Sequence, residues 1–191
     1  TRTTGTRRSV NWSFHSGPRG RRLSGFLRVT RRLLWTRLYR VDYRRRRPTR
    51  SMRAGLEEQV QVPVQIQAAM VAHARFCLPE EACGLVAADD EGILRMAYAT
   101  TNVDRSRVRF TVSPREHYGA IKHAERNGWS ITGSFHSHPE SPAFPSGRDI
   151  AAALDPDWLY FIVGLGNGYP ELRGFRIRDF RVAEVALRET P

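Results

Sequence analysis

The charge of this 191-residue chain changes sharply near residue 55, and this change decides which part can fold. Residues 1–55 carry 17 Arg and one acidic residue, Asp42, for a net charge of +16, whereas residues 56–191 carry 14 Lys and Arg against 18 Asp and Glu, for −4. A segment of like charges without a sustained apolar period buries too little surface to fold. We therefore expect a disordered tail over 1–55 and one folded domain over 56–191, a length that suits a single hydrophobic core.

Three interpretations of the Arg-rich tail stay open. It could be a nucleic-acid-binding arm, in which Arg neutralises phosphates and aromatic side chains stack on bases. It could be an organellar transit peptide, which is also Arg-rich and poor in acids. It could be upstream sequence translated from a misplaced start, with Met52 as the first residue; we favour this third interpretation because the composition changes beside Met52. Nucleic acid is then expected as a partner only through the tail.

The cysteine and apolar content of the chain indicates its cellular location. Cys77 and Cys83 are six residues apart and form no Cys-x-x-Cys motif, so neither a zinc knuckle nor a disulfide framework is expected. A reducing, cytoplasmic location is the default for such a chain. No run reaches the roughly 18 apolar residues that a membrane-spanning helix needs, so no membrane association is expected.

Hydrophobic periodicity in the second segment predicts an α/β fold, because helices and strands alternate around what reads as one sheet. Apolar residues at helical spacing predict a helix that ends before Pro79, and Ser113 followed by Pro114 predicts the start of another. The expected helices cover 62–77, 113–129 and 146–154. The expected strands cover 82–88 and 93–102, paired as a hairpin, and 108–112, 130–138, 158–165, 171–179 and 181–187.

The stretch "SFHSHPESPAFPSGRDIAAAL", residues 134–154, places metal-ligand residue types at fixed distances. On a strand, residues i and i+2 face the same side, so His136 and His138 would project together. The following prolines turn the chain, after which Asp149 could return a carboxylate to the pair. Two histidines and one carboxylate would leave the fourth tetrahedral position open, which is typical of a catalytic zinc.

Each part of this pattern also has a purely structural interpretation. Ser146 and Asp149 form the Ser-x-x-Asp pattern of a helix capping box, and a His-x-His pair on a strand is often an ordinary surface or core feature. The continuous combination of all four residues favours the metal site. His15, His73, His117 and His123 show no such pattern, and we assign them structural or solvated roles.

At these residues the sequence resembles the JAMM/MPN+ zinc metallopeptidases, whose signature is His-x-His, seven residues, then Ser-x-x-Asp, with a glutamate upstream. The segment "PEEACGLVA" is similar to the family's stretch around that glutamate and places it at Glu81 rather than Glu80. The segment "VRFTVSPREHY" is similar to an edge strand with an aromatic residue, Phe110, that precedes Pro114 and a helix. The likeness covers about residues 60–170.

The resemblance implies a single MPN-type domain with a central mixed β-sheet flanked by helices, layered as in cytidine deaminases. It implies Zn²⁺ held by His136, His138 and Asp149, with zinc-bound water as nucleophile. Glu81 would be the general base, and Ser146 would donate a hydrogen bond to the oxyanion. The implied activity is that of a JAMM-type isopeptidase, similar to deubiquitinases.

The implied substrate is a small ubiquitin-like or sulfur-carrier protein, cleaved at the amide or isopeptide bond after its C-terminal Gly-Gly tail. Phe110 and its neighbours would line the groove for that tail, which would add as a strand to a sheet edge. The alternative is a non-catalytic MPN scaffold for protein–protein interaction. A zinc deaminase is disfavoured, because its His-x-Glu and Pro-Cys-x-x-Cys patterns are missing.

Overall fold

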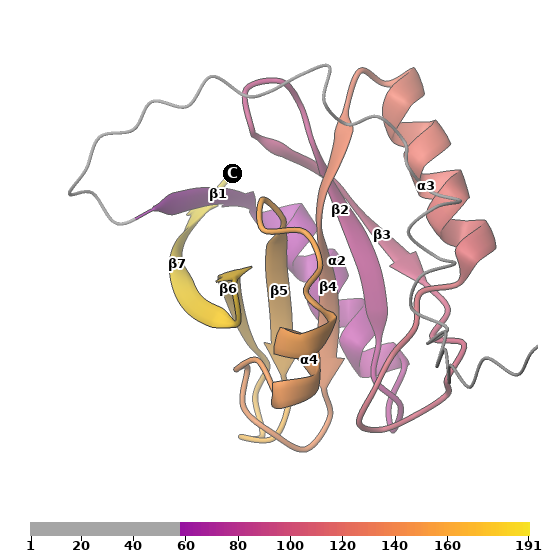
Figure 1. Ribbon diagram of the computed structural model, residues 1–191, viewed down its shortest axis with the longest axis vertical. Helices are drawn as coiled ribbons and strands as arrows, with labels where there is room; N and C mark the ends of the chain where they lie inside the picture. Colours follow the sequence, from indigo (N-terminus) through magenta and orange to yellow (C-terminus); the bar gives the residue numbers. More distant parts are fainter. Residues whose placement is uncertain (1–57) are drawn as a thin grey trace, which may run out of the picture. The chain divides into compact units, whose positions relative to one another are not determined.

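The computed structural model describes residues 58–191, so the expectations for the Arg-rich tail and for His15 lie outside the described residues. The described residues form a seven-stranded mixed sheet in the order β1-β7-β6-β5-β4-β2-β3 (Figure 1). The strands are β1 (Gln59–Pro63), β2 (Cys83–Ala88), β3 (Leu94–Thr100), β4 (Ser130–His138), β5 (Leu159–Gly164), β6 (Glu171–Arg178) and β7 (Arg181–Thr190). The expected α/β class with a central mixed sheet is confirmed.

Strand β4 lies inside the sheet, paired antiparallel with β2 and parallel with β5. The β1–β7 pair is the other parallel pair, and the remaining neighbours are antiparallel. In this register His136 stands between Cys83 of β2 and Ile162 of β5. A central strand hydrogen-bonded on both sides is a rigid support for side chains.

Helices cover both faces of the sheet. Helix α2 (Val64–Phe76) lies behind the sheet in Figure 1 and packs Met70 and Ala74 into the largest apolar cluster. Helix α3 (Pro114–Arg126) packs its apolar residues against the β2 and β4 side chains of the other face. The short helix α4 (Gly147–Ala152) follows β4 and lies in front of the sheet. Because the strand period is two, alternate β4 side chains face α2 and the α3/α4 side.

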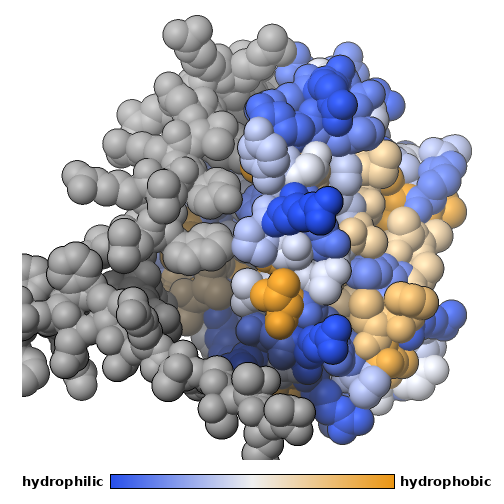
Figure 2. Space-filling model, turned by 90° about the vertical axis from the view of Figure 1, so that its right-hand side faces the viewer, coloured by the Kyte–Doolittle hydropathy of each residue, from blue (hydrophilic) through white to orange (hydrophobic). Residues whose placement is uncertain are grey.

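The surface visible in Figure 2 is mixed: hydrophilic residues alternate with apolar ones, and the apolar residues group toward the right-hand side. In the described part of the chain, no helix is long and apolar enough to cross a membrane. Both cysteines are free, and Cys83 is fully buried in the core, as expected for a small apolar side chain.

The first strand was missed from the sequence. Residues 62–63 were assigned to a helix, but Gln59–Pro63 form an edge strand parallel to β7, and helix α2 begins only at Val64. Val60 and Val62 alternate into the core with the period of a strand, and Pro63 ends the strand at the N-cap position of the helix. A two-valine alternation next to a strong helix pattern is too short to predict a strand.

The expected strand at 108–112 is also wrong. Within this segment only Val112 forms a β-bridge, with Asn102, and the rest of residues 103–111 form a loop beside the sheet. The Asn102 side chain bonds the amide of Thr111 and the carbonyl of Arg109, so backbone groups of this segment pair with a side chain rather than with a ladder.

Candidate metal centre

Three ligand-type atoms meet at the end of β4. His136 and His138 project to the same face of the strand, as expected, and both are buried. Their Nε2 atoms lie 3.1 Å apart. Asp149, on α4, places Oδ1 3.4 Å from Nε2 of His136 and Oδ2 3.3 Å from Nε2 of His138. The residues His136, His138 and Asp149 are therefore brought together as a possible metal-binding group.

The spacing of these atoms fits a tetrahedral cation. Ligands held 2.0–2.1 Å from zinc in a tetrahedral arrangement lie about 3.3 Å from one another. The two Nε2 atoms, 3.1 Å apart, come close to this value, and each imidazole has a different oxygen of Asp149 at 3.3–3.4 Å. Two imidazole nitrogens that face each other and one carboxylate, all buried or half-buried, form a nitrogen and oxygen donor set that suits Zn²⁺.

Two of the three side chains, His136 and Asp149, have pKa shifts that favour metal binding. Burial lowers the pKa of His136, which keeps its imidazole neutral. Burial would raise the pKa of Asp149, but hydrogen bonds from both histidines outweigh it and hold that pKa well below its usual range. For His138, burial lowers the pKa, and the hydrogen bonds and charge of Asp149 more than compensate, so the net shift is upward. A cation that binds here would displace the His138 proton.

A contact outside the ligand set orients His138. Its Nδ1 lies 3.0 Å from the carbonyl oxygen of Pro142, which accepts a hydrogen bond when Nδ1 carries the proton. Nε2 then presents its lone pair to the site. Gly164 lets this proline loop approach β5 closely, because a Cβ atom there would lie 2.8 Å from the Pro142 carbonyl carbon. The missing side chain at Gly164 thus helps to set the direction of the imidazole.

Asp149 also caps the helix that carries it. Ser146 occupies the N-cap of α4, its Oγ accepts from the Asp149 amide at 3.3 Å, and its own amide donates to Asp149 Oδ2 at 2.7 Å. The capping box considered for these two residues is therefore present. It does not exclude metal binding, since the same carboxylate faces both histidines.

Glu81 lies in the segment that leads into β2 and is 5% exposed. Burial raises its pKa from 4.5 to about 7; the charge of Asp149 adds to the rise, while His138 and Arg148 oppose it. These interactions show that the Glu81 carboxyl shares the electrostatic environment of the metal group. A carboxyl with a pKa near neutrality can both accept and return a proton.

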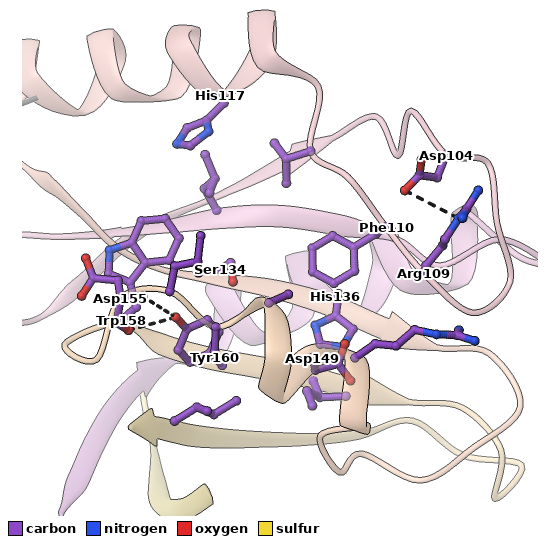
Figure 3. A pocket seen from close by; sticks show the side chains of 18 residues that line it. Asp104, Arg109, Phe110, His117, Ser134, His136, Asp149, Asp155, Trp158 and Tyr160 are labelled. Atoms are coloured by element: carbon purple, nitrogen blue, oxygen red, sulfur yellow. Dashed lines mark hydrogen bonds and ion pairs between the residues drawn. The ribbon is translucent and has the colours of Figure 1, made fainter. Parts of the chain in front are cut away.

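A cavity of about 500 Å³ opens beside His136 and Asp149. The Phe110 ring forms one wall and stacks on the His136 imidazole, with ring centroids 4.6 Å apart (Figure 3). Apolar and aromatic side chains also line the cavity, among them Leu85, Trp158, Tyr160, Ile162 and Ile177. A cavity of this size and character suits a peptide segment or another partly apolar ligand.

Several residues at the site were not found from the sequence. His117 was assigned a structural or solvated role, but it lines the cavity, and burial lowers its pKa. Arg148 lies inside the Ser-x-x-Asp motif, and its Nη1 donates to the carbonyl of Val108 at 2.7 Å, which joins α4 to the loop 103–111. Asn102 holds the same loop. A single sequence carries no pattern that marks such contacts between distant segments.

The fold and the site together define a class: α/β proteins with a mixed sheet whose central strand presents a His-x-His pair to an aspartate on the next helix. Residues 63–178 match the Prok-JAB family, the prokaryotic homologs of the JAB domain. The chain belongs to this family, which confirms the expected relationship to the JAMM/MPN proteins and places the chain among their prokaryotic members.

Similar proteins agree with this assignment. The CysO-cysteine peptidase of Mycobacterium tuberculosis is 35% identical over 119 residues, which are 61% of this chain and 81% of that protein. The desampylase of Haloferax volcanii is 35% identical over 111 residues, 57% of this chain and 79% of that protein. A solution structure of a Desulfitobacterium hafniense protein matches with a TM-score of 0.64 and 36% identity, over 69% of this chain and 92% of that one.

Proposed function

We propose that the protein is a zinc-dependent hydrolase that cleaves the amide or isopeptide bond after the Gly-Gly tail of a small ubiquitin-like or sulfur-carrier protein. The observation that carries the proposal is the group of His136, His138 and Asp149, whose ligand atoms, one from each residue, lie within 4.8 Å of one another and are the donor types of a zinc site. The names of the two curated relatives, a peptidase and a desampylase, support the reaction class.

Zinc held by these three residues would polarise the scissile carbonyl and lower the pKa of a water molecule. Glu81 is the general base: it takes a proton from the attacking water and returns it to the leaving amine. Its raised pKa of about 7 suits both steps. The low exposure of Glu81 also limits competing proton exchange with bulk water.

Ser146 is proposed to donate a hydrogen bond to the oxyanion that develops in the transition state. Its Oγ already accepts a hydrogen bond from the Asp149 amide, but a hydroxyl that accepts one hydrogen bond can still donate its own proton to another acceptor. The capping box fixes the Ser146 backbone, so the hydroxyl needs little reorganisation. Donors of this kind contribute about 3–4 kcal/mol to transition-state stabilisation.

The cavity next to the metal group would receive the substrate tail. Two glycines offer no side chains, so a flexible Gly-Gly segment can pass between the Phe110 ring and α4 to reach the metal. The apolar residues beyond, such as Trp158 and Tyr160, would contact the larger side chains that precede the glycines. The proposed amide and isopeptide bonds correspond to two leaving groups, a single amino acid and the side chain of a protein lysine.

The test combines metal content with cleavage. We would measure zinc per chain for the full-length protein and for Glu81→Ala and His138→Ala. The expected result is about one equivalent for the parent and for Glu81→Ala, with much less for His138→Ala. A small ubiquitin-like protein, extended after Gly-Gly by one amino acid or joined there to a lysine side chain, would then be incubated with each variant.

Only the zinc-loaded parent should release the added group, and a matched substrate with Val in place of the last Gly should resist. A parent that stays metal-free when zinc is supplied would refute the hydrolase and favour the scaffold. A zinc-loaded parent that cleaves neither substrate would refute the Gly-Gly specificity.

A further inference from the structure

The Asn102 side chain joins two segments beside the metal site that are far apart in the sequence. It is buried, and its Nδ2 donates to the carbonyl oxygens of Glu81 and Arg109, each at 3.0 Å. Its Oδ1 accepts from the amides of Asp104 at 3.0 Å and Thr111 at 3.2 Å. A primary amide offers two N–H donors and one oxygen with two lone pairs, so every hydrogen-bonding position of Asn102 is used.

The backbone at Glu81 depends on these bonds. Glu81 precedes β2, so sheet pairing does not fix it. Instead its amide donates to the Ser106 carbonyl at 2.8 Å, and its carbonyl accepts from Asn102. The next amide, of Ala82, donates to Oγ of Ser137 at 2.8 Å. Ser137 lies between the two histidine ligands on β4 and faces the opposite side of the strand. These bonds attach the backbone at Glu81 both to the metal-binding strand and to the loop 103–111.

The second donor bond of Asn102 reaches the wall of the cavity. Arg109, whose carbonyl accepts it, directly precedes Phe110, and the Phe110 ring stacks on His136. The buried Asn102 amide therefore bonds both the segment that carries Glu81 and the loop that carries Phe110. Neither partner is a metal ligand, so loss of Asn102 leaves the contacts among His136, His138 and Asp149 in place, although it frees the loop whose Phe110 ring stacks on His136.

We propose that Asn102 is a positioning residue that sets Glu81 and Phe110 in place relative to the metal ligands. The inference rests on the proposed role of Glu81 as general base. A displacement of about 1 Å in a reacting group can cost about 100-fold in rate. Removal of the Asn102 amide should therefore lower kcat by about 10- to 100-fold while the metal content stays unchanged.

Two variants and one control test this role in the full-length, zinc-loaded protein. Asn102→Ala removes all four bonds, whereas Asn102→Asp keeps the shape and the acceptor oxygen but lacks the amide donors to Glu81 and Arg109. The control, Thr111→Val, removes a different hydrogen bond of the same loop, from Thr111 Oγ1 to Asp104 at 2.8 Å. The probe is a ubiquitin-like protein whose Gly-Gly terminus is joined to a fluorogenic aminocoumarin.

Both Asn102 variants should retain about one zinc per chain and lose about 10- to 100-fold in kcat, and the control should lose less than about threefold. A double-mutant cycle separates positioning from general damage. In a Glu81→Gln background, followed under single-turnover conditions, Asn102→Ala should lower the rate much less than in the parent, because no base remains to be positioned and only the Phe110 loop is still affected. An equal loss in both backgrounds, or loss of zinc from the Asn102 variants, would overturn the proposal.

A second measurement needs no substrate. Amide hydrogen exchange at Glu81, which reports its bond to Ser106, should be at least about tenfold faster in both Asn102 variants than in the parent. The Leu165 amide, bonded to the His138 carbonyl at 3.0 Å, is the internal control and should not change. If the parent cleaves no probe, the proposed function is refuted. Hydrogen exchange still tests the positioning role of Asn102 in that case, because unchanged exchange at the Glu81 amide would refute it.

Discussion

Replacement of Glu81 by Gln should stabilise the metal-free protein, and the gain should grow with pH. Glu81 is 5% exposed, and burial raises the pKa of its carboxyl from 4.5 to about 7. The folded pKa of Glu81 exceeds its unfolded pKa. Its contribution to the free energy of unfolding is therefore fully present below pH 4.5 and is lost as pH rises through about 7. Gln has nearly the same shape and does not ionise, so it escapes this loss.

The size of the effect follows from the two pKa values. They differ by about 2.5, and one pH unit corresponds to about 1.4 kcal/mol, so ionised Glu81 costs the folded protein about 3 kcal/mol. The stability advantage of Glu81→Gln should be near its minimum at pH 5 and about 2–3 kcal/mol larger at pH 8. Bound zinc should reduce this difference, because a nearby cation stabilises the carboxylate.

Equilibrium urea unfolding in the presence of a chelator, at pH 5 and at pH 8, measures the difference between the two proteins. Glu80→Gln is the matched control, since Glu80 is the adjacent acid, and it should show no comparable pH dependence. If the gain in unfolding free energy from Glu81→Gln changes by less than about 1 kcal/mol between the two pH values, the Glu81 carboxyl is not desolvated in the folded protein, and the reasoning is wrong.

Three further changes test other parts of the site. Gly164→Ala should weaken zinc binding by about 10- to 100-fold in a competition titration, because the new methyl group displaces the Pro142 carbonyl that orients His138; unchanged affinity would remove that role from Gly164. Asp149→Asn should abolish stoichiometric zinc binding in elemental analysis and leave the circular dichroism spectrum intact, since an amide oxygen can still accept the N-cap bond. Phe110→Ala should raise KM by about 3- to 10-fold at constant zinc content, as expected from the loss of a stacked aromatic wall; an unchanged KM would show that the tail does not pass this ring.

The sequence predicted the elements that have a strong period of their own. The hairpin of β2 and β3, helix α3 and the long strand β4 were all expected near their observed positions, because each buries a regular apolar pattern. The metal group could be predicted for the same reason: i and i+2 on a strand share a face, and a proline-rich turn before a capped helix returns the chain to that face. The distance between Asp149 and the histidines depends on the tertiary structure and could not be read from spacing.

The wrong strand prediction lies where a side chain replaces part of the backbone pairing. Residues 108–112 have the composition of a strand, but beyond the single bridge of Val112 the Asn102 side chain bonds the Arg109 carbonyl and the Thr111 amide. Glu81 could be chosen over Glu80 only through the family resemblance, since nothing local distinguishes two adjacent acids. The structure separates them, because only Glu81 is buried within the field of Asp149 and His138.

Strand β4 carries two ligands and one anchor on alternate faces: His136 and His138 face the cavity side, and Ser137 faces α2 and holds the Ala82 amide. A shift of β4 by one residue against β2 and β5 would exchange these faces completely. Ser137 would then point into the metal site, and both imidazoles would enter an apolar core without partners. A one-residue insertion or deletion between His136 and His138 would therefore place the two imidazoles on opposite faces of β4 and remove the metal group.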